Sequence, residues 1–165
     1  MEILQQIMVI EFLLFSAIGF FWIFLYFYMD YESKRLPRHP ERYPPVTVVI
    51  PAYNEEKTIA KTIKSIIDAD YPHKEIIVVN DGSTDKTQEI IENFSASIRI
   101  INFERNRGKV NALNTAIKQA NGEIIVTVDA DSVIDRDALR NIVRHFQDPR
   151  VGAVAGFVKI YNTAV

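Results

Sequence analysis

Residues 46–80 read VTVVIPAYNEEKTIAKTIKSIIDADYPHKEIIVVN, and the fold class of the chain can be predicted from their pattern. It opens on a β-branched run at 46–51 and closes on a second, mostly apolar run at 75–80. Short runs rich in Val and Ile on both faces predict buried strands. Because the segment between the runs is long enough for a helix, the stretch predicts a strand–helix–strand unit with parallel strands.

The segment between the two runs carries the spacing of a helix with one apolar face. The isoleucines that make up this face are Ile59, Ile63, Ile66 and Ile67. Upstream, Asn54 is a residue type that caps helices, and Glu55 and Glu56 carry the negative charge favoured in a first turn. We therefore predict a helix that is capped by Asn54 and ends at Asp68.

The same alternation continues along the chain. The further predicted elements are a helix at 84–94, a strand at 98–102, a helix at 108–120, a strand at 123–129, a helix at 135–146 and an extended segment at 151–161. On the helix at 108–120, Val110, Leu113 and Ile117 form the stripe expected to face the core. Strands alternating with helices indicate an α/β fold, a doubly wound and mostly parallel sheet covered on both faces.

The N-terminal region is different in character. Residues 12–29 (FLLFSAIGFFWIFLYFYM) carry no charge, and about 18–20 such residues cross a bilayer as a helix. A cleaved signal peptide has its positive charge before the apolar run, whereas here Glu2 precedes the run and Lys34 and Arg35 follow it.

We therefore expect a single-pass transmembrane helix at 1–29 in the cell membrane and a Pro-rich juxtamembrane linker at 30–45. The domain that follows, residues 46–165, is expected to be cytoplasmic, because basic residues flanking a span favour the cytoplasmic side.

Composition excludes several classes of protein. The 165 residues are 48% hydrophobic and 24% charged, as in globular proteins, with a formal net charge of −2. There is no basic excess, so nucleic acid is not an expected partner. The chain has no cysteine, which excludes disulfides, thiolate metal sites and cysteine nucleophiles.

The strand at 123–129 ends in a pair of carboxylates, Asp129 and Asp131. In extended backbone, residues two apart lie on the same side, and two carboxylates this close repel each other unless a cation lies beside them. Mg²⁺ or Mn²⁺ held by one or two carboxylates and by substrate phosphates fits such a pair. The alternative is that either aspartate only caps the following turn.

Two further polar positions follow predicted strands. Gly108 and Lys109 open a helix, where free N–H groups and the lysine charge favour an anion; a solvated lysine is the alternative. Asp81 follows the strand at 75–80 and can accept a hydrogen bond from a base or ribose, although the Gly and Ser that follow also suit an ordinary turn. The spacing around Gly108 is not that of a Walker A loop, and no G-x-G-x-x-G motif follows the first strand.

Four ordered motifs resemble one family. VTVVIPAYNEEKTIAKTIKSI, EIIVVNDGSTDKT, NRGKVNALNTAI and IIVTVDADS look like the nucleotide-sugar-binding half of glycosyltransferase family 2, which has a GT-A-like fold. The N-terminal membrane helix, taken with residues 135–162, resembles the processive polysaccharide synthases of poly-N-acetylglucosamine, hyaluronan and chitin.

The resemblance implies roles for individual residues. Ala52, Tyr53 and Glu55 would line a uridine pocket, and Asp81 would hydrogen-bond the uracil. Lys109 would lie near the nucleotide and its diphosphate. Asp129 would lie at the ribose and the sugar, and Asp131 would bind the divalent metal (Mg²⁺ or Mn²⁺). Asp129 and Asp131 are therefore the candidate catalytic residues.

The sequence also departs from the family pattern. The family's catalytic base, an Asp in a later Glu-Asp or Thr-Glu-Asp motif, and the Gln-x-x-Arg-Trp motif of processive members do not occur in these 165 residues. The expectation is an N-terminal portion of an enzyme: a fragment, a truncated gene product or a split subunit that a C-terminal half complements.

The resemblance implies an inverting transfer from a UDP-sugar, with N-acetylglucosamine as a candidate sugar, to a growing polysaccharide or another hydroxyl acceptor. Two alternatives stay open. One is a non-catalytic or split nucleotide-sugar-binding subunit. The other is a polyprenyl-phosphate sugar synthase, which would share the donor motifs and use a lipid-linked acceptor.

Overall fold

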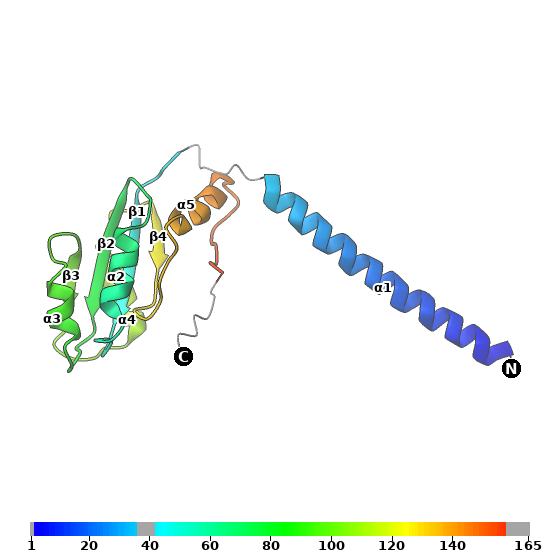
Figure 1. Cartoon of the computed structure of the whole chain (residues 1–165), viewed down its shortest axis with the longest axis horizontal. Coiled ribbons are helices and arrows are strands. Elements are labelled where there is room, and N and C mark those ends of the chain that lie inside the picture. The colour runs from blue at the N-terminus through cyan, green and yellow to red at the C-terminus, as the bar shows by residue number, and fades with distance from the viewer. Residues whose placement is uncertain (1, 36–41, 158–165) are drawn as a thin grey trace. The chain divides into compact units, whose positions relative to one another are not determined.

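The computed structural model describes residues 2–35 and 42–157, and the chain divides into two compact units, Met1–Pro37 and Arg38–Val165. The first unit is one helix, α1 (Glu2–Arg35) (Figure 1). Its segment Ile3–Tyr31 is long and apolar enough to cross a membrane, and its most apolar 18-residue window is 0% buried. The helix extends through residues 30–35, which begin the predicted linker, while positions 36–41 of that linker lie outside the described residues.

The second unit is built on a parallel sheet. Its strands are β1 (Val46–Ala52), β2 (Lys74–Asn80), β3 (Arg99–Asn102) and β4 (Ile124–Thr127). They lie in the order β3-β2-β1-β4, and every neighbouring pair is parallel (Figure 1). The predicted doubly wound α/β architecture is confirmed, and the carboxyl ends of all four strands meet at one edge.

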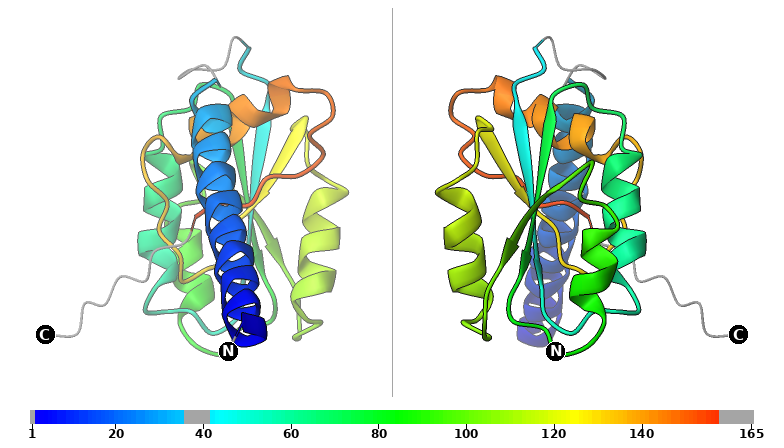
Figure 2. Two further views of the ribbon diagram at one scale, coloured as in Figure 1. Left: turned by 90° about the vertical axis from the view of Figure 1, so that its right-hand side faces the viewer. Right: turned by 90° about the vertical axis from the view of Figure 1, so that its left-hand side faces the viewer.

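Helices cover both faces of the sheet (Figure 2). They are α2 (Ile59–Ile67), α3 (Thr87–Glu92), α4 (Lys109–Ile117), α5 (Ala138–Val143) and the 3₁₀ helix η1 (Arg144–Gln147). The apolar side chains of α2, α3 and α5 pack in one core, whereas α4 packs in a second core on the opposite face.

Strand β1 shows how the sequence builds these two cores. Val46, Val48 and Ile50 belong to the core under α2, and Val49 belongs to the core under α4. Successive side chains of a strand point to opposite faces, so a strand buried on both sides must be apolar at nearly every position. Each fully buried Val or Ile contributes about 1.5–3 kcal/mol relative to an exposed one.

The predicted beginning of α2 is wrong. Helix α2 begins at Ile59 with Thr58 as its cap residue, and residues 56–58 form a turn. Asn54 has a φ of 55°, in the left-handed region, and its Oδ1 accepts a hydrogen bond from the Thr84 N–H. Asn54 therefore caps no helix, because its side chain holds a loop that follows another strand.

The predicted apolar stripe of α4 is also wrong at two of its three positions. Val110 is 70% exposed and Ile117 is 43% exposed, while Ala112 and Ala116 are fully buried. The helix presents a face centred on these alanines, with Leu113 half-buried beside them. Small side chains at the contact let α4 pack close to the sheet, and the larger side chains of Val110 and Ile117 lie outside that contact.

The remaining differences concern element ends. The regular parts of α3, α4 and α5 are shorter than predicted, and the helix predicted at 135–146 continues from α5 as η1. Residues 151–157 form no strand, and the rest of the predicted extended segment lies outside the described residues.

Candidate functional site

A buried carboxylate lies at the carboxyl edge of the sheet. Asp81 directly follows β2 and is 3% exposed. Its Oδ1 accepts a hydrogen bond from the Arg107 N–H at 2.7 Å, and its Oδ2 accepts one from the Gly108 N–H at 2.8 Å. Its own N–H donates to the Ala52 carbonyl at 2.8 Å. Asp81 therefore joins the end of β1 to the loop that leads into α4.

The loops that follow β1 and β2 are joined to each other. The Asn54 N–H donates to Ser83 Oγ at 3.1 Å, and the Thr84 N–H donates to Asn54 Oδ1 at 2.9 Å. The Glu55 N–H donates to Thr87 Oγ1 at 2.8 Å. No single motif predicts this network; its signal in the sequence is the concentration of Asn, Ser, Thr and Asp in two consecutive loops.

Asp85 extends the same network. Its Oδ2 accepts from the Glu56 N–H at 3.2 Å, and its Oδ1 accepts from the Thr87 N–H at 2.9 Å. Burial acts to raise the pKa of Asp85, but hydrogen bonds from the Thr87 hydroxyl, the Thr87 N–H and the Glu56 N–H outweigh burial and lower this pKa below its ordinary value. The two loops are thus held together by an ionised carboxylate.

The three residues predicted to line a uridine pocket lie at the end of β1 or just after it. Ala52 is buried at 2% exposure, whereas Tyr53 is 44% exposed. Glu55 is half-buried, and its Oε2 accepts a hydrogen bond from the Thr58 hydroxyl at 2.8 Å. Of the three, Tyr53 presents the largest surface to an incoming ligand.

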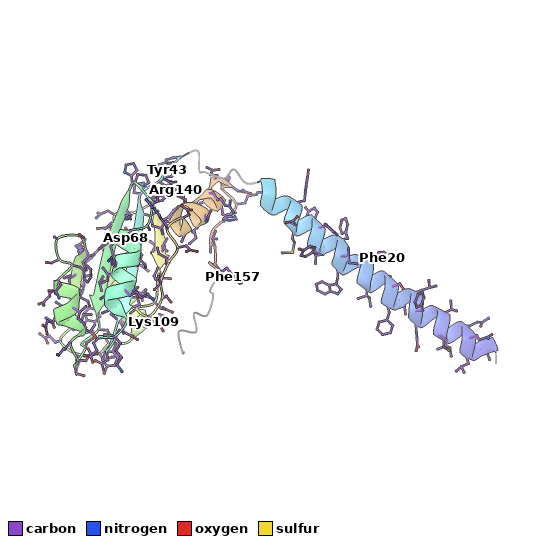
Figure 3. The ribbon with its side chains drawn as sticks, in the orientation of Figure 1. Phe20, Tyr43, Asp68, Lys109, Arg140 and Phe157 are labelled. Atoms are coloured by element: carbon purple, nitrogen blue, oxygen red, sulfur yellow. The ribbon has the colours of Figure 1, made fainter. Side chains whose placement is uncertain are left out.

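Lys109 and Asp129 meet at the same edge. Lys109 is the first residue of α4 and Asp129 lies two residues after the end of β4. The Lys109 Nζ lies 2.5 Å from the Asp129 Oδ1, with side chains 60% and 57% exposed. Figure 3 places Lys109 at the opposite end of this unit from Tyr43 and Arg140. The fold thus brings Lys109 and Asp129, two of the residues to which the resemblance gives a role, into contact.

Asp131 is exposed to solvent, and its Oδ1 accepts a hydrogen bond from Ser132 Oγ at 3.4 Å. Among the described residues, no group of three or more His, Cys, Asp or Glu side chains is placed to hold a metal ion. A cation bound here would need other ligands besides protein carboxylates. Mg²⁺ is commonly held by one or two carboxylates together with substrate phosphates and waters. The exposed Asp131 carboxylate could serve as one of these ligands.

A hollow of about 230 Å³ lies at the other end of the sheet, beside Val46 and Glu75. The Glu75 carboxylate there accepts hydrogen bonds from the Thr47 hydroxyl, the Asn121 N–H and the Asn121 side chain. These donors already satisfy it, and ligands of parallel α/β sheets bind beyond the carboxyl ends of the strands. We therefore take the edge that carries Asp81, Lys109 and Asp129 as the candidate site.

Comparison with known proteins agrees with this fold. The sequence model of glycosyl transferase family 2 matches residues 47–165. The poly-β-1,6-N-acetyl-D-glucosamine synthase of Staphylococcus epidermidis is 43% identical over 120 residues, which cover 71% of this chain and 29% of the synthase. The enzyme of the same name from Staphylococcus aureus strain COL is 36% identical over 164 residues, covering 92% of this chain and 40% of that enzyme. The chain thus spans less than half the length of these curated relatives.

Solved structures are similar as well. The mannosyltransferase PcManGT of Pyrobaculum calidifontis, in complex with GDP-Man and Mn²⁺, is 34% identical with a TM-score of 0.66, over 83% of this chain and 43% of that one. Residues 1–349 of S. aureus TarS are 32% identical with a TM-score of 0.58, over 63% of this chain and 32% of that one. TarS structures also exist with UDP and with UDP-GlcNAc. With residues 47–165 matched, this chain belongs to glycosyl transferase family 2.

Proposed function

We propose that this chain forms the donor-binding part of a membrane-anchored, metal-dependent glycosyltransferase that acts in polysaccharide synthesis. The observation that carries the proposal is the junction at the carboxyl edge of the sheet. There Asp81 joins β1 to the loop before α4, and Lys109, which follows that loop, contacts Asp129. A UDP-sugar is the proposed donor, in keeping with the UDP and UDP-GlcNAc complexes of TarS.

Each residue has a proposed task. Ala52, Tyr53 and Glu55 would flank the uridine, with Asp81 accepting a hydrogen bond from the uracil in addition to those from the loop. Lys109 would exchange its contact with Asp129 for the diphosphate, because a lysine at the beginning of a helix is well placed for an anion. Asp129 would then be free to accept hydrogen bonds from the ribose and sugar hydroxyls.

Asp131 would hold Mg²⁺ or Mn²⁺ together with the diphosphate, and the cation would neutralise negative charge on the departing UDP. The mannosyltransferase from P. calidifontis, which was solved with Mn²⁺, supports a divalent cation here. In the proposed transfer a sugar hydroxyl of the acceptor forms a bond to the anomeric carbon while the bond to UDP breaks, with inversion. The hydroxyl proton passes to a base that we assign to no residue of this chain.

Helix α1 is the proposed anchor. Its segment Ile3–Tyr31 meets the length and hydropathy of a membrane span, and the basic residues after it favour the cytoplasmic side for the domain. A donor site in the cytoplasm would have direct access to soluble UDP-sugar. The acceptor would be a growing polysaccharide held near the membrane.

The test is calorimetric titration of UDP into the full chain in detergent, with Mn²⁺ and with EDTA. We expect binding that strengthens with Mn²⁺, and we expect Asp131→Asn to abolish that strengthening. Asp135→Asn is the matched control, because it makes the same change at another exposed aspartate, four positions further on, and should bind as wild type. If wild type binds UDP neither with Mn²⁺ nor with EDTA, the proposal is wrong.

A further inference from the structure

The loop that carries Asp129 and Asp131 is attached to helix α2 by a buried hydroxyl. Thr62 is fully buried, and its Oγ1 donates a hydrogen bond of 2.8 Å to the carbonyl of Ala130, which is 5% exposed. The two residues are 68 positions apart in the chain. The contact therefore fixes the backbone at the residue that separates the two aspartates.

A second hydroxyl of α2 holds the same loop further along. The Ile134 N–H donates to Ser65 Oγ at 3.2 Å, and the Ser65 hydroxyl donates to the Thr62 carbonyl at 2.8 Å. Residues three apart on a helix are neighbours on its surface, so Thr62 and Ser65 act from one side of α2. The loop is thus held on both sides of Asp131.

The position of Thr62 is unusual for its surroundings. The other fully buried side chains of α2 are those of Ile59, Ile63 and Ile66, so an aliphatic residue would suit the packing equally well. A buried carbonyl without a donor, however, costs about 1–3 kcal/mol. The Thr62 hydroxyl removes this cost only when the Ala130 carbonyl points at α2, and this requirement selects one conformation of the loop.

We propose that Thr62 is a positioning residue for the metal-binding carboxylate of this site. By fixing the Ala130 carbonyl, its hydroxyl holds Asp131 in the orientation that receives a divalent cation together with a diphosphate. The inference rests on the proposed function, since it assigns Thr62 to the same donor site. Thr62 itself touches neither the cation nor the nucleotide.

The experiment compares Thr62→Val, which keeps the shape and removes the hydroxyl, with Thr62→Ser, which restores it. UDP is titrated into each full chain in detergent, with Mn²⁺ and with EDTA. We expect Thr62→Val to weaken binding in Mn²⁺ about fivefold to tenfold and to leave binding in EDTA unchanged. Thr62→Ser should recover the affinity of wild type in Mn²⁺.

Thr47→Val is the matched control. Thr47 is also fully buried, and its hydroxyl donates to Glu75 at the opposite end of the sheet. The substitution therefore removes an equivalent group far from the site. Wild-type affinity of Thr62→Val in Mn²⁺, or an equal loss in Thr47→Val, overturns the proposal.

Hydrogen exchange separates this inference from the proposed function. The Ser132 N–H donates to the Asp129 carbonyl within the same loop, so its exchange rate reports whether the loop is held. We expect faster exchange at Ser132 and Ile134 in Thr62→Val and no change there in Thr47→Val. If wild type binds no UDP, the proposed function fails, and unchanged exchange in Thr62→Val then rejects the positioning role independently.

Discussion

The Lys109 ammonium lies 2.5 Å from the Asp129 carboxylate, although the two residues are 20 positions apart in the chain. Helix α4 begins after β3, one outer strand of the sheet, and Asp129 follows β4, the other outer strand. More than half of each side chain is open to solvent. Exposed ion pairs add only about 0–1 kcal/mol to stability, so a pair in this position is better suited to exchanging partners than to holding the fold.

Substitution of Lys109 should separate binding from stability. In Lys109→Met we expect UDP affinity to fall about tenfold, because one cation near the diphosphate is lost. The melting temperature should stay within about 4 °C of wild type, since the ion pair is exposed. Calorimetry and circular dichroism measure the two quantities. Lys118→Met changes an exposed lysine at the other end of α4 and should alter neither UDP affinity nor melting temperature. If Lys118→Met loses as much affinity as Lys109→Met, Lys109 does not belong to the site.

Asp81 should stabilise the loop before α4, to which its carboxylate is hydrogen-bonded. Asp81→Asn leaves one acceptor oxygen for the two N–H groups of Arg107 and Gly108 and brings an amide NH₂ toward one of these donors. The amide NH₂ cannot accept, so the loop loses at least one of the two hydrogen bonds that Asp81 gives it. We expect amide exchange at Arg107 and Gly108 to become at least about tenfold faster, as measured by hydrogen exchange. Unchanged protection of both amides would show that the loop does not depend on Asp81.

The sheet could be predicted from the sequence because its signal is local. Strands β1 and β2 are buried on both faces, so each is a continuous apolar run that can be read without its neighbours. The location of the candidate site could also be predicted, because polar residues that follow parallel strands must gather at the carboxyl end of the sheet. Lys109 and Asp129, which the resemblance assigns to the diphosphate and to the ribose and sugar, are in contact in the structure.

What could not be predicted depends on contacts between distant segments. Asn54 has the composition of a helix cap, yet its side chain bonds to Thr84, thirty positions further on. The burial of Ala112 rather than Val110 depends on which face α4 turns toward the sheet. Thr62 is one polar residue on an apolar helix face, and only the tertiary fold brings the Ala130 carbonyl to it.

Two glycines with positive φ should respond differently to alanine. Gly82 has a φ of +69°, and a Cβ there would lie 2.3 Å from the Arg105 carbonyl carbon. Gly108 has a φ of +87°, but no atom lies within 4 Å of its Cβ position. Gly108 has a ψ of 151°, in a region that is essentially restricted to glycine, so Gly108→Ala costs backbone strain alone, about 1–3 kcal/mol. Gly82→Ala also forces two backbone segments apart. Thermal unfolding should show a clearly larger loss for Gly82→Ala; equal losses would contradict the close approach.

The absence of cysteine allows the orientation of α1 to be tested with single introduced thiols. Ser95 is exposed in the second unit, and Glu2 precedes the apolar segment. If the domain lies in the cytoplasm, a membrane-impermeant maleimide should label Glu2→Cys in intact cells and Ser95→Cys only after permeabilisation. The chain without cysteine is the control for background labelling. Labelling of Ser95→Cys in intact cells would reverse the proposed orientation.

Glu75 should contribute stability that depends on pH. Burial acts to raise its pKa, but hydrogen bonds from Asn121 and Thr47, together with the charge of Arg99, outweigh burial and lower this pKa below the ordinary 4.5. A carboxyl whose pKa is lower in the folded chain than in the unfolded chain stabilises the fold above about pH 4.5 and loses that contribution as pH falls through the folded-state pKa.

The substitution Glu75→Gln removes this contribution and one of the acceptor oxygens. At pH 7 we expect the variant to be less stable than wild type by about 1–2 kcal/mol, because hydrogen bonds to a charged group are lost. At pH 3 the gap between the two should narrow, since wild-type Glu75 is then moving toward protonation. Urea unfolding of the full chain in detergent at both pH values measures the gap. Glu104→Gln changes an exposed glutamate and should leave stability unchanged at either pH. If the stability difference between Glu75→Gln and wild type is the same at pH 7 and pH 3, the lowered pKa of Glu75 does not stabilise the fold.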